Sequence, residues 1–464
     1  MLTSFPEEWQ IVTGSEFVVD PKSDIVDGPF GSNLKASEYT YSGIPIARIQ
    51  NVKRFNFVDK NIRFVTTEKA EELHRHTFVR GDILITKLGD PLGLACEVPE
   101  SFDYGIIVAD LVRLRPNLKV CAKPYLIYLL NSDVVIKQIE THVKGTTRPR
   151  INLGVIRNLS LPLASLAEQK VIADKLDTLL AQVETTKARL ELIPEILKNF
   201  RQSVLADAVS GKLNAGDYQQ APVYKALGDV GVEVKTGPFG SALHKSEYIS
   251  GGIPVINPIH ISNGTIVASQ QMTIPKAKYD ELEAWHLKIG DVVVGRRGEM
   301  GRAAVVNYKG EMLCGTGSMI LRTPKNSLPK YLEIILRSPL AVEYFTSNSV
   351  GSTMVNLNQK IIKSLQVHFP SQEEQTEIVR RVEKLFAYAD KVEAQVKTAQ
   401  ARVNQLTQSI LAKAFRGELT ANWRAANPEL ISGENSAEAL LVIIKNERAK
   451  LSQTKKGRGK SVEN

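Results

Sequence analysis

Two long segments of the chain repeat apolar residues at alternating steps of four and three positions. The first runs through Ile172, Leu176, Leu179, Val183, the polar Thr186, Leu190, Ile193, Leu197, Phe200 and Val204. The second runs through Ile378, Val382, Leu385, Ala389, Val392, Val396, Ala399, Val403, Leu406 and Ile410. A mean spacing of about 3.5 residues keeps one stripe of a helix turned toward a partner helix. The pattern therefore predicts two coiled-coil helices, and we expect them to pack on each other.

The flanking residues predict where each helix begins and ends. Two S-x-x-E capping boxes precede the segments, Ser165 with Glu168 and Ser371 with Glu374. In such a box the hydroxyl and the carboxylate bind free amides of the first helical turn. Gly211 and Gly417 stand where a helix often ends on a left-handed residue.

A passage near the N-terminus returns in the second half of the chain. The motif "GPFGS" begins at both Gly28 and Gly237, so these copies lie 209 residues apart. From "GTT" at Gly145 and "GST" at Gly351 onward the distance is 206 residues, and both helical segments keep it. Self-similarity of this kind indicates a tandem duplication, followed by a tail. If the two helices run antiparallel, the duplication becomes a pseudo-twofold.

Each copy opens on a mixed segment, roughly residues 12–163 and 222–369. Runs such as "DILITKL", "IIVADLVRLRP" and "DVVVG" predict strands, whereas "PYLIYLLNS" and "KYLEIILRS" predict a helix in each copy. We therefore predict the α+β class, with two repeated α+β domains joined by two long antiparallel coiled-coil helices. The predicted boundaries are 1–163 and 214–369 for the domains, 164–213 and 370–419 for the helices, and 420–464 for a C-terminal helix and basic tail.

Composition and charge narrow the class of protein. A chain of 464 residues with 43% hydrophobic and 23% charged residues should fold into several domains. The net charge of +9 agrees with a polyanionic partner without requiring one. Cys96, Cys121 and Cys314 have no CxxC spacing, which argues against a disulfide framework or a zinc site and favours the cytoplasm. No run reaches the ~18 apolar residues of a membrane span.

Two related domains held at a set separation suit double-stranded DNA. A two-fold protein places its reading elements about one helical turn, ~34 to 36 Å, or a multiple apart. The chain in fact resembles the specificity subunits (HsdS) of Type I restriction–modification systems, in particular the enteric IA group. The resemblance covers nearly the whole chain and is strongest in "AEQKVIADKLDTLLA", "EEQTEIVRRVEKLFA" and the segments after them. "FPEEW" from Phe5 is similar to the family's N-terminal "LPEGW", and no second copy precedes the second domain.

The resemblance implies a function and a set of partners. Each domain would be a target recognition domain that reads one half of a bipartite, asymmetric DNA site, and the helices would set the gap. The helices would recruit two HsdM modification subunits and, through them, two HsdR restriction subunits. The assembly would methylate adenine N6 with S-adenosylmethionine and cleave DNA with ATP and Mg. This chain itself would bind no cofactor or metal and would have no catalytic residue.

Base-reading residues should be long polar side chains at positions where the two copies differ. Three clusters meet this condition: Arg48 and Asn51 against Asn257 and His260; Lys87 against Arg296 and Arg297; and Arg148 and Arg150 against Asn356 and Asn358. Arginine can bind the major-groove edge of G, and asparagine that of A, so such exchanges would change a half-site. These residues form the predicted DNA-binding set.

The repeated "GPFGS" motif predicts a tight turn, with proline second and glycine fourth. An alternative is that its bare amides approach a DNA phosphate, with Ser32 and Ser241 as further donors.

Motifs for catalysis are missing from the sequence. It contains neither a G-x-x-x-x-G-K-[ST] phosphate loop nor the [ND]-P-P-[YFW] motif of adenine methyltransferases. Glu233 and Lys235 imitate the end of a nuclease site but have no suitable acidic partner. One alternative stays open, a non-DNA scaffold protein with two ligand-binding domains on a coiled-coil spacer. The missing motifs argue against another, a fused single-chain nuclease or methyltransferase.

The C-terminal segment combines an apolar and a basic part. "SAEALLVIIKNERAK" predicts an amphipathic helix that docks on HsdM or on the coiled coil. "KNERAKLSQTKKGRGKSVEN" from Lys445 is basic and poor in large apolar residues, so we expect its end to be disordered.

Overall fold

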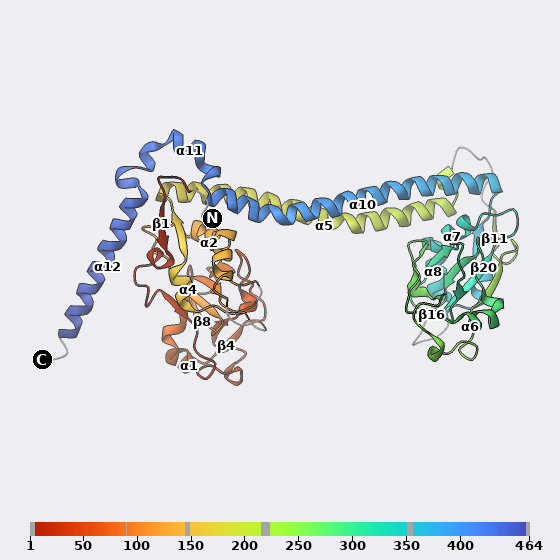
Figure 1. Ribbon diagram of the computed structural model, residues 1–464, viewed down its shortest axis with the longest axis horizontal. Helices are drawn as coiled ribbons and strands as arrows, with labels where there is room; N and C mark the ends of the chain where they lie inside the picture. The colour runs from red at the N-terminus through yellow and green to blue at the C-terminus, as the bar shows by residue number, and fades with distance from the viewer. Residues whose placement is uncertain (1–4, 90, 144–148, 215–222, 350–355, 461–464) are drawn as a thin grey trace. The chain divides into compact units, whose positions relative to one another are not determined.

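The computed structural model describes residues 5–89, 91–143, 149–214, 223–349 and 356–460. The chain divides into two compact units, Met1–Ala188 with Gln400–Asn464, and Arg189–Ala399. Each unit holds one α+β domain and part of both long helices (Figure 1). The α+β part before the first long helix is domain 1, and the part between the long helices is domain 2.

The two predicted long helices are present with the predicted ends. They are α5 (Leu166–Val209) and α10 (Gln372–Phe415), each of 44 residues. The amide of Glu168 donates to Ser165 Oγ at 3.2 Å, and that of Glu374 to Ser371 Oγ at 3.3 Å. Gly211 and Gly417 have φ of +76° and +75°, the left-handed conformation that favours glycine.

The second unit contains contacts that give the relative direction of α5 and α10. Arg201 of α5 pairs with Asp390 and Glu393 of α10, at 2.7 Å each. Beyond the end of α5, the carbonyl of Leu213 accepts a hydrogen bond from Arg381 Nη1 at 2.8 Å. As the residue number rises along α5 it falls along α10, so these helix segments are antiparallel.

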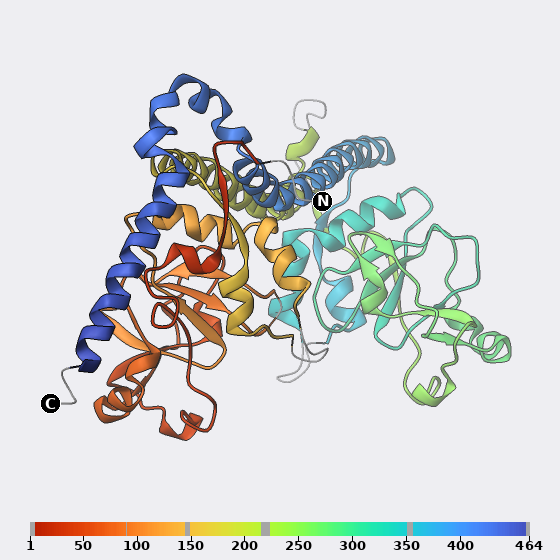
Figure 2. The same ribbon diagram turned by 60° about the vertical axis from the view of Figure 1, so that its left-hand side comes forward.

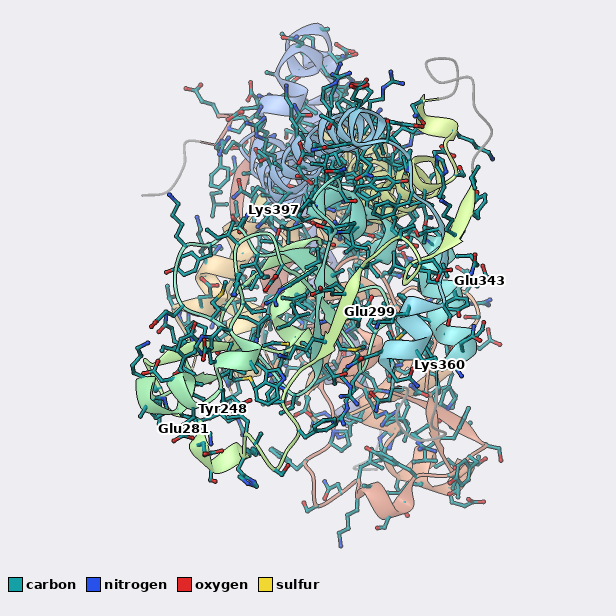
Figure 3. All side chains as sticks on the ribbon, turned by 90° about the vertical axis from the view of Figure 1, so that its right-hand side faces the viewer. Tyr248, Glu281, Glu299, Glu343, Lys360 and Lys397 are labelled. Carbon is teal, nitrogen blue, oxygen red and sulfur yellow. The ribbon has the colours of Figure 1, made fainter. Side chains whose placement is uncertain are left out.

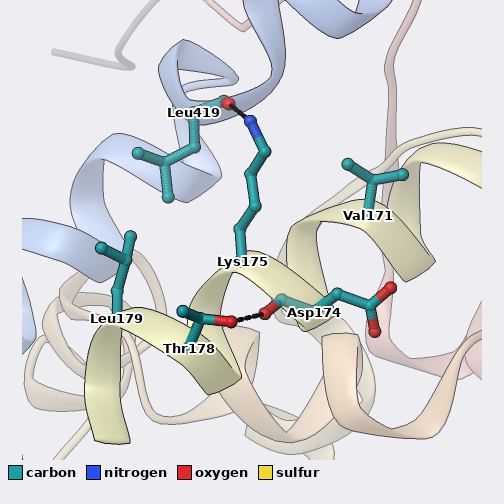
Figure 4. Close-up of a pocket in the computed structure, with 6 residues that line it drawn as sticks. All are labelled: Val171, Asp174, Lys175, Thr178, Leu179 and Leu419. Carbon is teal, nitrogen blue, oxygen red and sulfur yellow. Dashed lines mark hydrogen bonds between the residues drawn. The ribbon is translucent and has the colours of Figure 1, made fainter. Parts of the chain in front are cut away.

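The first unit contains the repeat-related counterpart of the last contact. The carbonyl of Leu419, beyond the end of α10, accepts from Lys175 Nζ near the start of α5 at 2.8 Å (Figure 4). Lys175 lies 206 residues before Arg381, and Leu213 lies 206 before Leu419. The sequence duplication therefore extends to individual contacts at the helix ends. Lys175 and Leu419 also line a pocket, together with Val171, Asp174, Thr178 and Leu179.

The carboxylates of the two capping boxes have partners other than the predicted ones. Glu168 is fully buried, and its carboxylate accepts from Trp9 Nε1 (2.8 Å), Thr420 Oγ1 (2.6 Å) and Arg424 Nη1 (2.6 Å). Glu374 accepts from Asn214 Nδ2 at 2.7 Å. The carboxylate half of the capping-box prediction is therefore wrong. Each carboxylate instead holds the segment that follows the other long helix, and Glu168 also holds the "FPEEW" motif.

Ten of the twenty predicted seam positions are buried, five on each helix. They are Ile172, Leu176, Val183, Leu197 and Val204 on α5, and Ile378, Val382, Ala389, Val396 and Val403 on α10. The prediction is wrong at Leu406, which is 42% exposed, while Leu411 and Phe415 enter the core of domain 1. A straight helix of about 3.6 residues per turn drifts from a 3.5-residue repeat, so the buried stripe moves along α10.

Domain 1 is built on two four-stranded sheets. One sheet has the order β2 (Ile25–Asp27), β9 (Leu111–Leu114), β6 (Ile83–Thr86) and β7 (Ala95–Glu97), all antiparallel. The other has the order β4 (Arg63–Val65), β3 (Ile44–Ala47), β8 (Tyr104–Ile107) and β5 (Thr77–Val79), in which β3 and β8 are parallel. A separate ribbon pairs β1 (Gln10–Thr13) with β10 (Ser160–Leu163). The helices are α1 (Thr67–Glu72), α2 (Lys123–Leu130), α3 (Asp133–Glu140) and α4 (Leu153–Asn158).

Domain 2 repeats this plan, so the α+β prediction is confirmed in both copies. Its antiparallel sheet has the order β12 (Glu233–Thr236), β20 (Ser318–Arg322), β17 (Val292–Gly295) and β18 (Ala303–Val305). A second sheet has the order β16 (Thr273–Ile274), β13 (Ile253–Ile256) and β19 (Leu313–Cys314). A separate hairpin, β14 (Ile261–Ser262) with β15 (Thr265–Ile266), follows β13 along the chain. β11 (Tyr224–Ala226) pairs with β21 (Gln366–His368). The helices are α6 (Lys276–Glu281), α7 (Pro329–Arg337), α8 (Pro339–Asn348) and α9 (Gln359–Lys363).

The C-terminal segment packs on domain 1. After α11 (Ala421–Ala426), helix α12 (Ala437–Lys460) lies alongside domain 1 (Figure 2) and buries Leu440 and Ile444 in its core. Glu447 accepts from Asn117 Nδ2 at 2.6 Å and pairs with Lys119, which lowers the pKa of this carboxyl. The expectation of disorder is wrong as far as Lys460, and residues 461–464 lie outside the described residues. The packing of Leu440 and Ile444 against domain 1 stabilises α12, and the basic composition of the segment does not predict this packing.

All three cysteines are buried and unpaired, and burial raises the pKa of the Cys96 thiol to about 12. Among the described residues, the structure contains no helix that combines the length and the apolar character of a membrane span.

Candidate nucleic-acid interface

Six of the eleven predicted DNA-binding residues lie in loops at one end of the antiparallel sheets: Lys87, Arg150, Arg296, Arg297, Asn356 and Asn358. In domain 1, Asp27 ends β2, Leu111 begins β9 and Thr86 ends β6, and their register places these three positions side by side. The loops that leave this end are therefore neighbours although they are far apart in sequence. We call residues 27–33, 87–89, 108–110 and 149–151 the loop cluster of domain 1, and residues 236–242, 296–298, 315–317 and 356–358 the loop cluster of domain 2.

Lys87 is the centre of the loop cluster of domain 1. Its Nζ lies 2.8 Å from Asp27 Oδ2, and its amide donates to the carbonyl of Asp110 at 2.9 Å. Its carbonyl accepts from the amide of Ile151 at 3.0 Å, next to a β-bridge between Leu88 and Arg150. The structure thus brings Lys87 and Arg150 together, and the Arg150 side chain is exposed. Arg148 lies outside the described residues.

A continuous chain of contacts links the predicted residues of domain 2. Asn257 Oδ1 accepts from the amide of Gly317 at 3.3 Å, and the carbonyl of Gly317 accepts from the amide of Arg296 at 2.9 Å. Arg296 Nε then donates to Asn356 Oδ1 at 2.9 Å. Burial and the neighbouring Arg297 lower the pKa of Arg296. Arg297 forms a β-bridge with Asn356 and is exposed.

Figure 3 faces the second unit and gives landmarks for this loop cluster. Glu299 follows the 296–298 loop, and Lys360 lies on α9 just after Asn358. Asn358 Oδ1 accepts from the amide of Ile361 at 2.9 Å and so caps α9. Asn358 therefore has a structural role as a helix cap, and its base contact stays a prediction.

Asn51 and His260 also have structural tasks. The Asn51 side chain is fully buried, with Oδ1 accepting from the amide of Arg48 (3.0 Å) and Nδ2 donating to the carbonyls of Val58 (2.9 Å) and Lys60 (3.1 Å). His260 occupies the same place in domain 2, and its Nδ1 accepts from the amide of Asn257 at 3.1 Å. Two chemically different, buried side chains therefore accept the same kind of amide hydrogen bond. Base contacts by Asn51 and His260 stay a prediction.

Arg48 is half-buried at the start of this turn. Its Nη2 donates to the carbonyl of Asn61 at 2.5 Å. Arg48 follows Ala47, whose carbonyl accepts from the amide of Val108 at 3.2 Å and so connects this turn to the loop cluster.

The "GPFGS" motif forms a turn in both domains, but two residues later than predicted. The carbonyl of Phe30 accepts from the amide of Asn33, and that of Phe239 from the amide of Ala242, at 2.8 Å each. The first glycine serves another purpose. A Cβ atom on Gly28 would lie 2.0 Å from the carbonyl oxygen of Val108, so only glycine allows this close approach of two backbones.

Comparison with known proteins assigns the family. A family model described as the Type I restriction modification DNA specificity domain matches residues 36–195 and 223–399. The chain belongs to the family of type I restriction–modification DNA specificity subunits. The specificity subunit of the enzyme EcoBI from Escherichia coli is 41% identical over 439 residues, which cover 90% of each chain. That of EcoKI, from strain K12, is 41% identical over 472 residues, covering 98% of this chain and 99% of the relative.

Solved structures show that the fold also agrees. The HsdS subunit from Thermoanaerobacter tengcongensis has a TM-score of 0.58 and 19% identity, covering 89% of this specificity subunit and 98% of that chain. A chain from a structure of a type I restriction–modification assembly has a TM-score of 0.65 and 18% identity, covering 89% and 99%. These findings do not favour the alternative of a non-DNA scaffold.

Asp27 is one residue of the specificity subunit's loop cluster that the sequence reasoning missed. It neutralises Lys87, whereas the corresponding residue of domain 2 is Thr236, 209 positions later. A signal was present, because Asp27 and Thr236 differ immediately before the shared motif. The two loop clusters therefore differ in charge as well as in side-chain shape.

The shared role of Asn51 and His260 leads to a prediction about pH. Burial lowers the pKa of His260, so below about pH 6.5 the unfolded chain binds a proton that the folded chain does not. The free energy of unfolding of the second unit should therefore fall as the pH drops below that value, until it passes the lowered pKa. His260→Asn introduces the domain 1 residue and should remove this part of the pH dependence. Urea unfolding of both proteins at several pH values checks this, and identical pH profiles would contradict it.

Proposed function

We propose that each α+β domain reads one half of a bipartite DNA site through its loop cluster. One observation carries the proposal. Both domains place corresponding loops at the same end of the same sheet, yet fill them with different polar side chains, Lys87 and Arg150 in one and Arg296, Arg297 and Asn356 in the other. Shared loops provide a common way to approach DNA, and unlike side chains on them provide two different readings.

We also propose the partners that complete the enzyme. Relatives are named as specificity subunits of type I restriction enzymes, which supports modification and restriction subunits as partners of this chain. In the proposed assembly two modification subunits use S-adenosylmethionine to methylate adenine, and two restriction subunits use ATP and Mg. The long helices are the proposed recruiting surface and spacer. The chain itself contributes DNA recognition and no catalytic group.

The test combines methylation with DNA binding. The full chain is purified alone and together with its proposed modification subunit, and methylated adenines are mapped on genomic DNA from a methylation-free host. We expect one bipartite sequence to be methylated by the mixture and none by either protein alone. Methylation by this chain alone would overturn the non-catalytic assignment. A mixture that assembles but neither binds nor methylates DNA would overturn the proposed function.

Replacing domain 1 provides a second readout in the same assay. If residues 12–163 are exchanged for those of a related subunit, only one half of the methylated sequence should change. A change in both halves would show that the domains do not read independently.

A further inference from the structure

Each domain exposes a phenylalanine at the same position of the repeat. Phe30 is 78% exposed and Phe239 is 66% exposed, and they lie 209 residues apart in the two "GPFGS" motifs. A single exposed apolar side chain needs no explanation. Two aromatic rings that are exposed at equivalent positions of a duplicated fold need an explanation, because each copy could have replaced its ring independently by a polar side chain.

The backbone around both rings is held firmly. The amide of Gly28 donates to the carbonyl of Leu111 at 3.1 Å, and that of Gly237 to Ser318 at 3.0 Å. Pro29, which precedes Phe30, is buried, and the carbonyl of Phe30 closes the following turn. The ring is therefore presented to solvent from an anchored loop, which lowers the entropy that a contact would cost.

Both rings belong to the loop clusters. Asp27, three residues before Phe30, contacts Lys87 through its side chain. In domain 2, Gly237 bonds to Ser318, the neighbour of Gly317, which contacts both Asn257 and Arg296. Each phenylalanine thus extends from the same sheet end as the residues proposed to read DNA.

The surroundings favour a nucleic acid over a protein as the ligand of these rings. The residues after Phe30 are Gly31, Ser32 and Asn33, which are small or polar and exposed. A protein-docking surface is usually a contiguous apolar patch of several hundred Å². One ring among polar and basic groups matches the apolar wedges that enter a base step while cations bind the phosphates.

We propose that Phe30 and Phe239 are DNA wedges, each of which inserts its ring against the bases of the half-site that its own domain binds. The proposal rests on the proposed function and adds a contact that supplies affinity and opens a base stack. The loss of base–aromatic contact on alanine substitution corresponds to roughly 5- to 150-fold weaker binding. Each variant should affect only one half-site.

The test uses the full chain assembled with its modification subunit, and a duplex that carries the mapped site. 2-Aminopurine, whose fluorescence rises when it is unstacked, replaces one base at a time in and beside each half-site. We expect the wild-type assembly to raise the signal at one place in each half. Phe30→Ala should abolish the signal in one half and weaken binding about 5- to 150-fold, and Phe239→Ala should do the same in the other half.

Controls separate this proposal from the alternatives. Leu118→Ala removes a residue that is 61% exposed beside Asn117 and Lys119, which contact α12, and should leave DNA binding and fluorescence unchanged. Unchanged thermal unfolding of the phenylalanine variants verifies that they fold. If the wild-type assembly methylates DNA but both variants bind it with wild-type affinity and fluorescence, the wedge proposal is wrong and the proposed function stands. Loss of assembly with the modification subunit would instead identify the rings as protein contacts and also overturn the wedge.

Discussion

Glu168→Ala is expected to lower the free energy of unfolding of the first unit by about 3–5 kcal/mol, because it removes the buried carboxylate of an ion pair and leaves the largely buried Arg424 only the more distant Glu8, at 3.9 Å. The Glu168 side chain is fully buried and Arg424 is only 13% exposed, with 2.6 Å between their atoms. Trp9 Nε1 and Thr420 Oγ1 would lose their acceptor at the same time. We therefore expect more frequent local unfolding of three segments together: the N-terminal motif, the start of α5 and the segment after α10.

The duplication supplies a matched control for this variant. Glu374 occupies the same place at the start of α10, but its carboxylate accepts from the neutral amide of Asn214 and is 15% exposed. Glu374→Ala should cost about 1.5–3 kcal/mol, the usual value of a hydrogen bond to a charged group. Glu168→Gln keeps the shape and removes the charge, so its cost should lie between these two.

Urea unfolding combined with hydrogen exchange measures the effect in each unit. We expect faster exchange at the start of α5 in Glu168→Ala and normal exchange at the start of α10. Equal costs for the two alanine variants would contradict the role assigned to Glu168.

Helix ends and strand positions could be predicted because they depend on neighbours in sequence. The hydroxyl of Ser165 can reach only the amides of its own turn, and Gly211 ends a helix through its own φ. The partner of the Glu168 carboxylate could not be predicted in this way. Trp9, Thr420 and Arg424 come from distant parts of the chain, and only the antiparallel helices bring them to the start of α5.

The predicted reading residues stay a prediction, but the structure shows which of them lie together. The repeat offset pointed to loops that are neighbours in space, since Lys87 lies beside Arg150 in domain 1 and Arg296 beside Asn356 in domain 2. A difference between copies does not, however, identify a reader. Asn51 and His260 differ in chemistry but accept the same type of amide hydrogen bond, which a comparison of side-chain types cannot distinguish from a change of specificity.

Arg297→Leu should reduce binding to one half-site by roughly 5- to 150-fold, the range that corresponds to one good bidentate base contact. Arg297 is exposed, whereas Arg296 is partly buried and holds Asn356, so Arg297 is the better candidate for a base contact in domain 2. Leucine is chosen because Leu88 occupies this position in domain 1 and forms the same β-bridge, Leu88 with Arg150 as Arg297 with Asn356. The substitution therefore keeps a backbone geometry that the fold already tolerates.

The comparison of half-sites distinguishes a base contact from a phosphate contact at Arg297. Binding of the assembly is measured on duplexes in which one half of the mapped site is altered, over a range of salt concentrations. If Arg297 reads a base, the variant should lose discrimination at one position of the domain 2 half-site and keep full discrimination in the other half. If it binds a phosphate, affinity should fall for all sequences and the salt slope should decrease by about 1. If the variant keeps the wild-type affinity, discrimination and salt slope, Arg297 does not belong to the interface. The loss of an exposed arginine from a DNA-binding surface must change at least one of these three quantities.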